Sequence, residues 1–65
     1  MTLIELLEVI NENTLVFIYD INNICISYYD GKNNIDESLN NYNVLDIRCN
    51  GNAIEIIIKY EFQYS

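Results

Sequence analysis

A chain of 65 residues forms a single domain, which we expect to span residues 1–65. Ten acidic side chains against three basic ones give a net charge of −7. This charge disfavours direct nucleic acid binding, because affinity for phosphates comes from Lys and Arg, and it favours a protein partner with a basic surface.

The N-terminus lacks the basic start and the apolar run of a secretion signal, and no apolar stretch reaches the length of a membrane span. We therefore expect a protein of the cytoplasm that has no membrane partner. Cys25 and Cys49 are interpreted as reduced, small, buried residues, and a disulfide between them is the alternative.

The first predicted element is a short helix that starts after Thr2. Thr2 and Glu5 have the spacing of a capping box, in which each side chain accepts a backbone N–H of the other residue. Apolar residues then recur on one helical face, at Leu3, Leu6, Leu7 and Ile10. A helix this short does not persist alone, so it should pack on a sheet.

Four strands are predicted after the helix. Residues 14–20 and 24–29 are rich in β-branched and aromatic residues and flank a turn at Asn22-Asn23. Residues 44–49 and 54–64 form a second hairpin around Asn50-Gly51-Asn52. The segment between the hairpins is a loop with one helical turn at residues 36–39. The predicted fold class is α+β, a four-stranded antiparallel sheet (α-β-β-loop-β-β) with one N-terminal helix packed on one face.

The period of two along the strands assigns their residues to two faces. On the helix side we expect Phe17, Ile26, Leu45, Ile47, Ile54, Ile56 and Ile58. The other face still carries apolar residues, and burying them against a second copy would stabilise the protein, which predicts a homodimer or a higher homo-oligomer. In the alternative interpretation these apolar residues are simply exposed, as scattered apolar residues are on any protein surface. The self-association candidates are Val16, Ile18, Val44 and Ile57, joined by Tyr60 and Phe62 of a last strand that overhangs the sheet.

No catalytic motif is present in the sequence. The chain has no His, the usual general base and the commonest metal ligand, and its two glycines cannot build a phosphate-binding loop. We therefore expect no enzyme and no cofactor. Carboxylates could still hold a metal, the candidates being Asp20, Asp30, Asp36, Glu37 and Asp46, but a calcium loop from Asp30 fails because Lys32 and Ile35 break its pattern.

Tyr28, Tyr29, Asp30 and Lys32 lie where a predicted strand runs into the longest loop. Aromatic and charged residues at such a position are typical of an interaction surface, so these four are the candidates for partner binding. In the alternative interpretation both tyrosines pack against the sheet and Asp30-Gly31 only turns the chain.

Several segments together resemble small proteins from phages and prophages of low-GC Gram-positive bacteria. They are Met1-Thr2-Leu3 with residues 5–10, Asn13-Thr14 with residues 18–20, residues 29–32 and residues 42–47. Among characterised proteins of this kind, several inhibit bacterial antiviral systems, including type II-A anti-CRISPR proteins. The resemblance implies a small acidic inhibitor, encoded by a phage, that binds and blocks a host defence protein with a basic surface inside a bacterial cell.

Two alternatives to this inhibitor stay open. One is a metal-dependent anti-CRISPR-type protein that nicks or remodels DNA through the carboxylates named above. The other is a sponge for a nucleotide immune signal, which would use Tyr28, Tyr29, Lys32 or Arg48 for base and phosphate.

Overall fold

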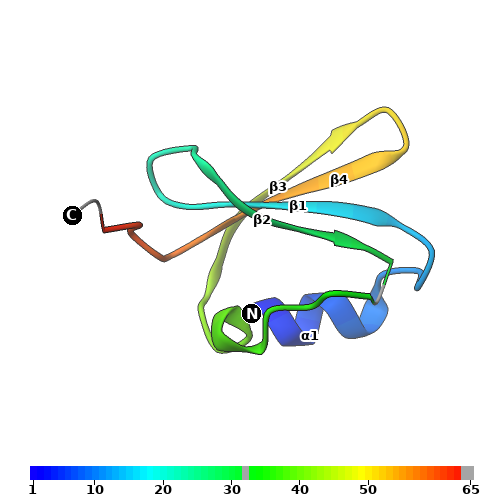
Figure 1. The fold of residues 1–65 in the computed structure, drawn as a ribbon, viewed down its shortest axis with the longest axis horizontal. Coiled ribbons are helices and arrows are strands. Elements are labelled where there is room, and N and C mark those ends of the chain that lie inside the picture. Colours follow the sequence, from blue (N-terminus) through cyan, green and yellow to red (C-terminus); the bar gives the residue numbers. More distant parts are fainter. Residues whose placement is uncertain (32, 64–65) are drawn as a thin grey trace.

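The computed structural model describes residues 1–31 and 33–63 (Figure 1). One helix, four strands and a 3₁₀-helix follow one another in the described chain, which confirms the α+β class. They are α1 (Leu3–Val9), β1 (Leu15–Tyr19), β2 (Cys25–Asp30), η1 (Glu37–Leu39), β3 (Val44–Asn50) and β4 (Ala53–Ile58). The helical turn expected at residues 36–39 is η1, with Asp36 as its N-cap.

The strand order is β2-β1-β4-β3, and the sheet is mixed. Both hairpins are antiparallel as predicted, but β1 and β4 pair in parallel, so the prediction of a fully antiparallel sheet is wrong. The two central strands are the most apolar, Leu-Val-Phe-Ile-Tyr in β1 and Ala-Ile-Glu-Ile-Ile-Ile in β4. Central strands lose the most contact with water, which favours this order over one that leaves either strand at an edge.

The capping box at the start of α1 is confirmed. The Thr2 hydroxyl accepts from Glu5 N at 3.4 Å, and the Glu5 carboxylate accepts from Thr2 N at 2.9 Å. Two further N–H groups of the first turn, those of Leu3 and Ile4, donate to the carbonyls of Tyr42 and Asn40. The start of the helix is therefore held against the segment that leads from η1 into β3.

The second hairpin turns at Gly51, whose φ is +62°, the conformation that the favoured two-residue hairpin turns have at their first central residue. The strand that follows ends at Ile58 instead of running to residue 64, because the N–H of Tyr60 donates to the Ile58 carbonyl in a three-residue turn. The ring of Tyr60 packs edge-on against Tyr42, with centroids 5.0 Å apart. Tyr64 lies outside the described residues.

The core forms between α1, η1 and one face of the sheet. Its buried members are Leu3, Leu6, Leu7, Val16, Ile18, Tyr29, Leu39, Ile56 and Ile58. Val16 and Ile18 have exposed fractions of 1% and 0%, so the prediction that they lie on the open side of the sheet is wrong. Phe17 lies on the other face from its two neighbours, since successive strand residues alternate.

Two more of the self-association candidates lie on the helix side. Val44 pairs with the buried Ile58, and both Val44 and Tyr60 pack against the core. Leu45 and Ile47, predicted for the core, are instead 54% and 46% exposed. Leu45 lies at the irregularity in the pairing between Val44 and Asp46, and Ile47 lies on the β3–β4 hairpin, which extends away from α1 (Figure 1).

Cys25 and Cys49 are free and exposed, so their predicted burial is wrong. They lie on β2 and β3, the opposite edges of the sheet. Three strand spacings separate these edges by about 14 Å, well beyond the Cα separation that a disulfide permits. In addition, no helix within the described residues has the length and apolar character needed to cross a membrane.

Candidate functional site

The face of the sheet opposite α1, called the open face below, gathers side chains from all four strands. Residues paired between neighbouring strands project from the same face, and Phe17 pairs with both Tyr28 and Glu55, while Glu55 pairs with Arg48. The same registers place Leu15, Tyr19, Asp30, Asp46 and Ile57 on this face. The helices α1 and η1 both pack on the opposite side, so no element of the described chain covers the open face (Figure 1).

A polar network crosses the middle of the open face. Tyr19 donates its hydroxyl hydrogen to Glu55 Oε2 at 2.9 Å, and Arg48 Nε lies 3.4 Å from Glu55 Oε1 as an ion pair without the alignment of a hydrogen bond. The Arg48 guanidinium also sits 5.3 Å from the centroid of the Tyr19 ring and donates from Nη2 to Asn23 Oδ1 at 2.8 Å. These contacts tie β3, β4, β1 and the β1–β2 turn together.

The network also shifts the ionisation of Tyr19. The hydrogen bond to Glu55, with partial burial and the negative charge of that carboxylate, raises the pKa of the Tyr19 hydroxyl above its ordinary value, although Arg48 opposes the shift. Tyr19 therefore stays protonated and keeps donating to Glu55 at neutral pH. Because the ion pair is partly exposed, its main effect is to fix side-chain positions; it adds little stability.

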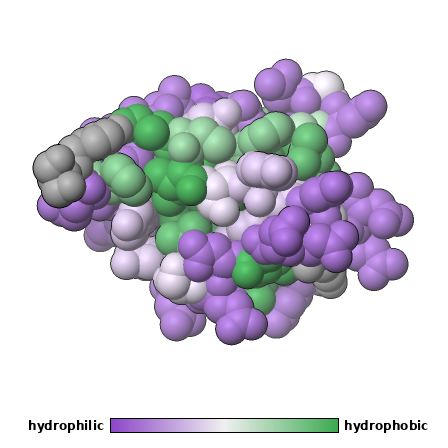
Figure 2. Space-filling view, in the orientation of Figure 1, coloured by the Kyte–Doolittle hydropathy of each residue, from purple (hydrophilic) through white to green (hydrophobic). Residues whose placement is uncertain are grey.

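An aromatic pair lies beside this network, toward the β2 edge. The rings of Phe17 and Tyr28 have centroids 6.3 Å apart and are tilted by 39°, and Tyr28 is 58% exposed. Asp30 is exposed on the same face of β2. Figure 2 shows, for one side of the molecule, that apolar side chains reach the surface in patches among hydrophilic ones.

The predicted partner-binding residues are divided between the two faces. Tyr28 and Asp30 are exposed on the open face, whereas Tyr29 is 0% exposed in the core and donates its hydroxyl hydrogen to the Asp36 carbonyl at 3.4 Å. Burial raises the pKa of the Tyr29 hydroxyl. Tyr29 thus offers no surface to a partner. Lys32 lies outside the described residues.

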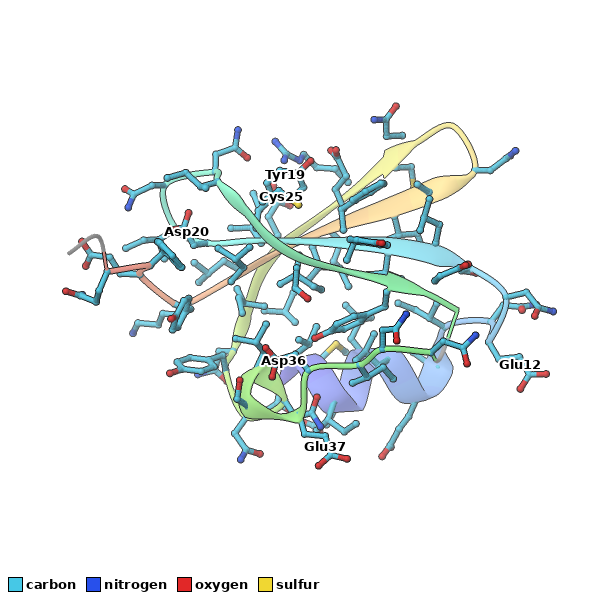
Figure 3. The ribbon with its side chains drawn as sticks, in the orientation of Figure 1. Glu12, Tyr19, Asp20, Cys25, Asp36 and Glu37 are labelled. Carbon is cyan, nitrogen blue, oxygen red and sulfur yellow. The ribbon has the colours of Figure 1, made fainter. Side chains whose placement is uncertain are left out.

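The carboxylates proposed as metal ligands mostly accept hydrogen bonds from their own neighbourhood. Asp36 Oδ1 accepts from Ser38 N and Oγ, and Asp46 Oδ1 accepts from Ile47 N. Figure 3 shows Asp20 at the β1–β2 turn, far from Asp36 and Glu37 at η1. Within residues 1–31 and 33–63 the structure contains no group of three or more acidic, His or Cys side chains that could hold a metal ion.

Asp20 is the buried acid of the described chain, and it holds the β1–β2 turn to the segment after β4. Its Oδ1 accepts from the backbone N–H groups of Asn22 and Ile24 at 2.9 and 3.0 Å, and its Oδ2 accepts from Phe62 N at 3.2 Å. Burial alone raises the pKa of the Asp20 carboxyl. The hydrogen bonds from Ile24, Phe62 and Asn22 outweigh burial and leave this pKa below its ordinary value.

The lowered pKa of Asp20 predicts a loss of stability in acid. An acid whose folded pKa is depressed stabilises the fold above its unfolded pKa of about 3.9, and that stability is lost as the pH falls through the lower folded value. We expect the urea midpoint to decline below about pH 4. Asp20→Asn should lower the melting temperature at pH 7 by roughly 5 °C or more, because an amide nitrogen would face the Phe62 N–H.

The difference in melting temperature between the wild type and Asp20→Asn should shrink as the pH falls through the lowered pKa of Asp20, because the wild-type carboxyl then also becomes protonated. Glu8→Gln, on the exposed face of α1, is the matched control and should leave the acid profile as in the wild type. The pKa of Glu5 is lowered by its hydrogen bonds from Thr2. Glu5 therefore adds the same loss of stability in acid to all three proteins. A difference in melting temperature that stays constant from pH 7 down to the pH at which the wild type itself unfolds would contradict this role for Asp20.

Sequence reasoning missed the polar network. Counting back from the Gly51-Asn52 turn pairs Arg48 with Glu55, so this ion pair could have been found from the hairpin alone. The links to Tyr19 and Asn23 depend on the parallel pairing of β1 with β4, for which the sequence carries no local signal.

Comparison of the chain with protein-family models, with curated proteins and with solved structures finds no match.

Proposed function

We propose that this protein is a non-enzymatic inhibitor that binds a bacterial antiviral defence protein and blocks it by docking the open face on a basic surface. The observation that carries the proposal is an uncovered sheet face on which the half-buried Phe17 and the exposed Tyr28 form an aromatic pair. Tyr is enriched among the residues that dominate binding energy, and aromatic rings supply large contact areas at low entropic cost.

The charge of the open face supports a basic partner. Arg48 is paired with Glu55, while Asp30 at the β2 edge and Asp46 at the β3 edge are exposed and form no ion pair among the described residues. The face is therefore negative, like the chain as a whole, whose net charge is −7. Complementary charge accelerates encounter and selects against acidic partners. The class of target comes from the resemblance of the sequence to small anti-defence proteins.

The test uses a purified type II-A CRISPR effector and phage plating on bacteria that carry this defence. Phe17→Ala combined with Tyr28→Ala should weaken binding to the effector by ~30-fold or more, as for loss of a binding hot spot, and should abolish the rescue of plating seen with the wild type. Raising the salt concentration should slow association.

Val9→Ala is the matched control, because Val9 is an exposed apolar residue on α1, on the other side of the molecule. It should bind as the wild type does. Equal loss of binding in Val9→Ala and in the open-face variant would refute docking through the open face. Failure of the folded wild type to bind the effector or to change plating would refute this target.

A further inference from the structure

Among the described residues the strand β3 pairs with one strand, β4, and forms an edge of the sheet. Met1 covers the start of this edge, where its carbonyl accepts from Val44 N at 2.8 Å, so the edge is free from Leu45 onward. At the middle of this edge the N–H of Ile47 donates to the carboxylate of Asp46, the preceding residue of the same strand, at 2.9 Å. This local bond indicates that the Ile47 N–H points away from β4. In an antiparallel ladder the C=O of a residue points to the same side as its N–H, so Ile47 presents both groups to the free side.

The side chains of β3 do little to block this edge. Natural edge strands are commonly protected by Pro, by charged side chains, especially Lys, or by a bulge. The strand β3 has no Pro or Lys, and its two charged residues, Asp46 and Arg48, have opposite signs and project from the open face. Leu45 and Ile47 expose about half of their apolar surface. The irregularity of the strand lies between Val44 and Asp46, so the run from Asp46 to Asn50 is regular and can pair with another strand.

The charges of β3 select one pairing of the strand with itself. In an antiparallel pair of two β3 strands centred on Ile47, a two-fold axis relates the two copies and Ile47 lies opposite the partner's Ile47. Asp46 of each copy then lies opposite the partner's Arg48. A pair centred on Asp46 or on Arg48 instead brings like charges directly opposite each other, which destabilises a sheet. Of these registers, only the one centred on Ile47 is complementary.

We infer that two copies of this chain associate through β3, antiparallel and centred on Ile47, and join their four-stranded sheets into one continuous sheet. The Ile47 N–H then donates to the carbonyl of the partner's Ile47, and the Asp46 carboxylate turns to the partner's Arg48. A guanidinium has five N–H donors, and the contacts of Arg48 with Glu55 and Asn23 use Nε and Nη2, so Arg48 can bind a second carboxylate without leaving Glu55.

The association differs from the one the sequence predicted, because Val16 and Ile18 are buried and the interface is an edge. It does not rest on the proposed function, and both copies keep their open faces accessible. One strand pair buries less area than a standard protein interface, so we expect a dissociation constant in the micromolar range.

The first experiment places a single cysteine on the axis. In a background with Cys25→Ser and Cys49→Ser, Ile47→Cys is oxidised with Cu(II)-phenanthroline. Two Cu(II) ions each accept one electron and become Cu(I), while the two thiols release two protons and form one disulfide. Directly opposite residues have Cα atoms about 5 Å apart, which suits a disulfide, so most of the protein should become a covalent dimer. Asn50→Cys is the matched exposed control, because its two copies would lie about 20 Å apart. Equal cross-linking of both variants, or more in Asn50→Cys, would overturn the inference.

The second experiment needs no cysteine and measures mass by light scattering from 5 to 200 μM, a range chosen to bracket a micromolar dissociation constant. The wild type should shift from monomer to dimer across this range. Asp46→Arg should raise the dissociation constant at least tenfold, and adding Arg48→Asp should restore dimerisation, because the opposite charges are then exchanged. A wild type that stays monomeric at the highest concentration, or a double variant that remains as weak as Asp46→Arg, would overturn the inference.

Discussion

Replacing Gly31 with alanine is expected to destabilise the fold by about 3 kcal/mol, whereas the same change at Gly51 should cost about 1 kcal/mol. Both glycines have a positive φ, +67° and +62°, so both variants suffer the strain of an L-residue in the left-handed region. At Gly31 the new methyl group would also overlap the carbonyl oxygen of Glu12 and approach Asn13 Cα. These are backbone atoms, which cannot move aside as a flexible side chain does.

The overlap at Gly31 affects a contact that holds two parts of the fold together. Gly31 N donates to the Thr14 carbonyl at 3.1 Å, so the turn after β2 rests directly on the segment between α1 and β1. At Gly51, by contrast, an added Cβ meets nothing within 4 Å, which makes Gly51→Ala the control for strain alone. Urea unfolding measures the loss in the free energy of unfolding of each variant, and the comparison is valid when their m-values are equal. Equal losses of stability would show that the contact with Glu12 is not tight.

The features that the sequence predicts correctly are those decided by neighbouring residues. The capping box needs only Thr2 and Glu5, three positions apart. The second hairpin needs a residue that tolerates positive φ, supplied by Gly51, between two apolar runs. Each of these signals is complete within a few residues, so no knowledge of the rest of the fold is required.

The parallel pairing of β1 with β4 and the choice of buried face depend on packing between distant segments. All five residues of β1 are apolar or aromatic, so alternation cannot say whether Val16 or Phe17 faces the helix. The choice is made where Val16 and Ile18 meet α1 and β4. The same holds for Leu45 and Ile47, whose pattern suits a core. Leu45 lies at the irregularity between Val44 and Asp46, and Ile47 lies on the part of the hairpin that extends away from α1 (Figure 1).

The candidate site likewise contains some contacts that the sequence predicts and others that only the folded structure reveals. The pair of Arg48 with Glu55 follows from hairpin register, which a sequence contains. The bond from Phe62 N to Asp20, by contrast, joins residues 42 positions apart and becomes visible only once the chain is folded. From the sequence alone, Asp20 is therefore a candidate metal ligand. In the structure its carboxylate accepts hydrogen bonds from three backbone N–H groups.

Replacing Tyr29 with alanine should have the largest effect of any change considered, a loss of about 3–5 kcal/mol. Tyr29 is fully buried between the sheet and η1 and contributes a large side chain to the core. A domain of this size has a total stability of the same order, so circular dichroism at 25 °C should show Tyr29→Ala largely unfolded. Tyr29→Phe keeps the ring and loses the hydroxyl, which contacts the Asp36 carbonyl and Ser27, so it should remain folded.

Tyr28→Ala provides the sharpest comparison, because it removes the same side chain one position away. Tyr28 is 58% exposed on the open face, so its loss should change the stability by less than about 1 kcal/mol. If the open face binds a basic partner, Tyr28→Ala should weaken that binding while the fold stays intact. A Tyr28→Ala variant that unfolds, or a Tyr29→Ala variant that stays folded, would show that the two tyrosines exchange faces, since a slip of one residue in β2 moves each side chain to the other side.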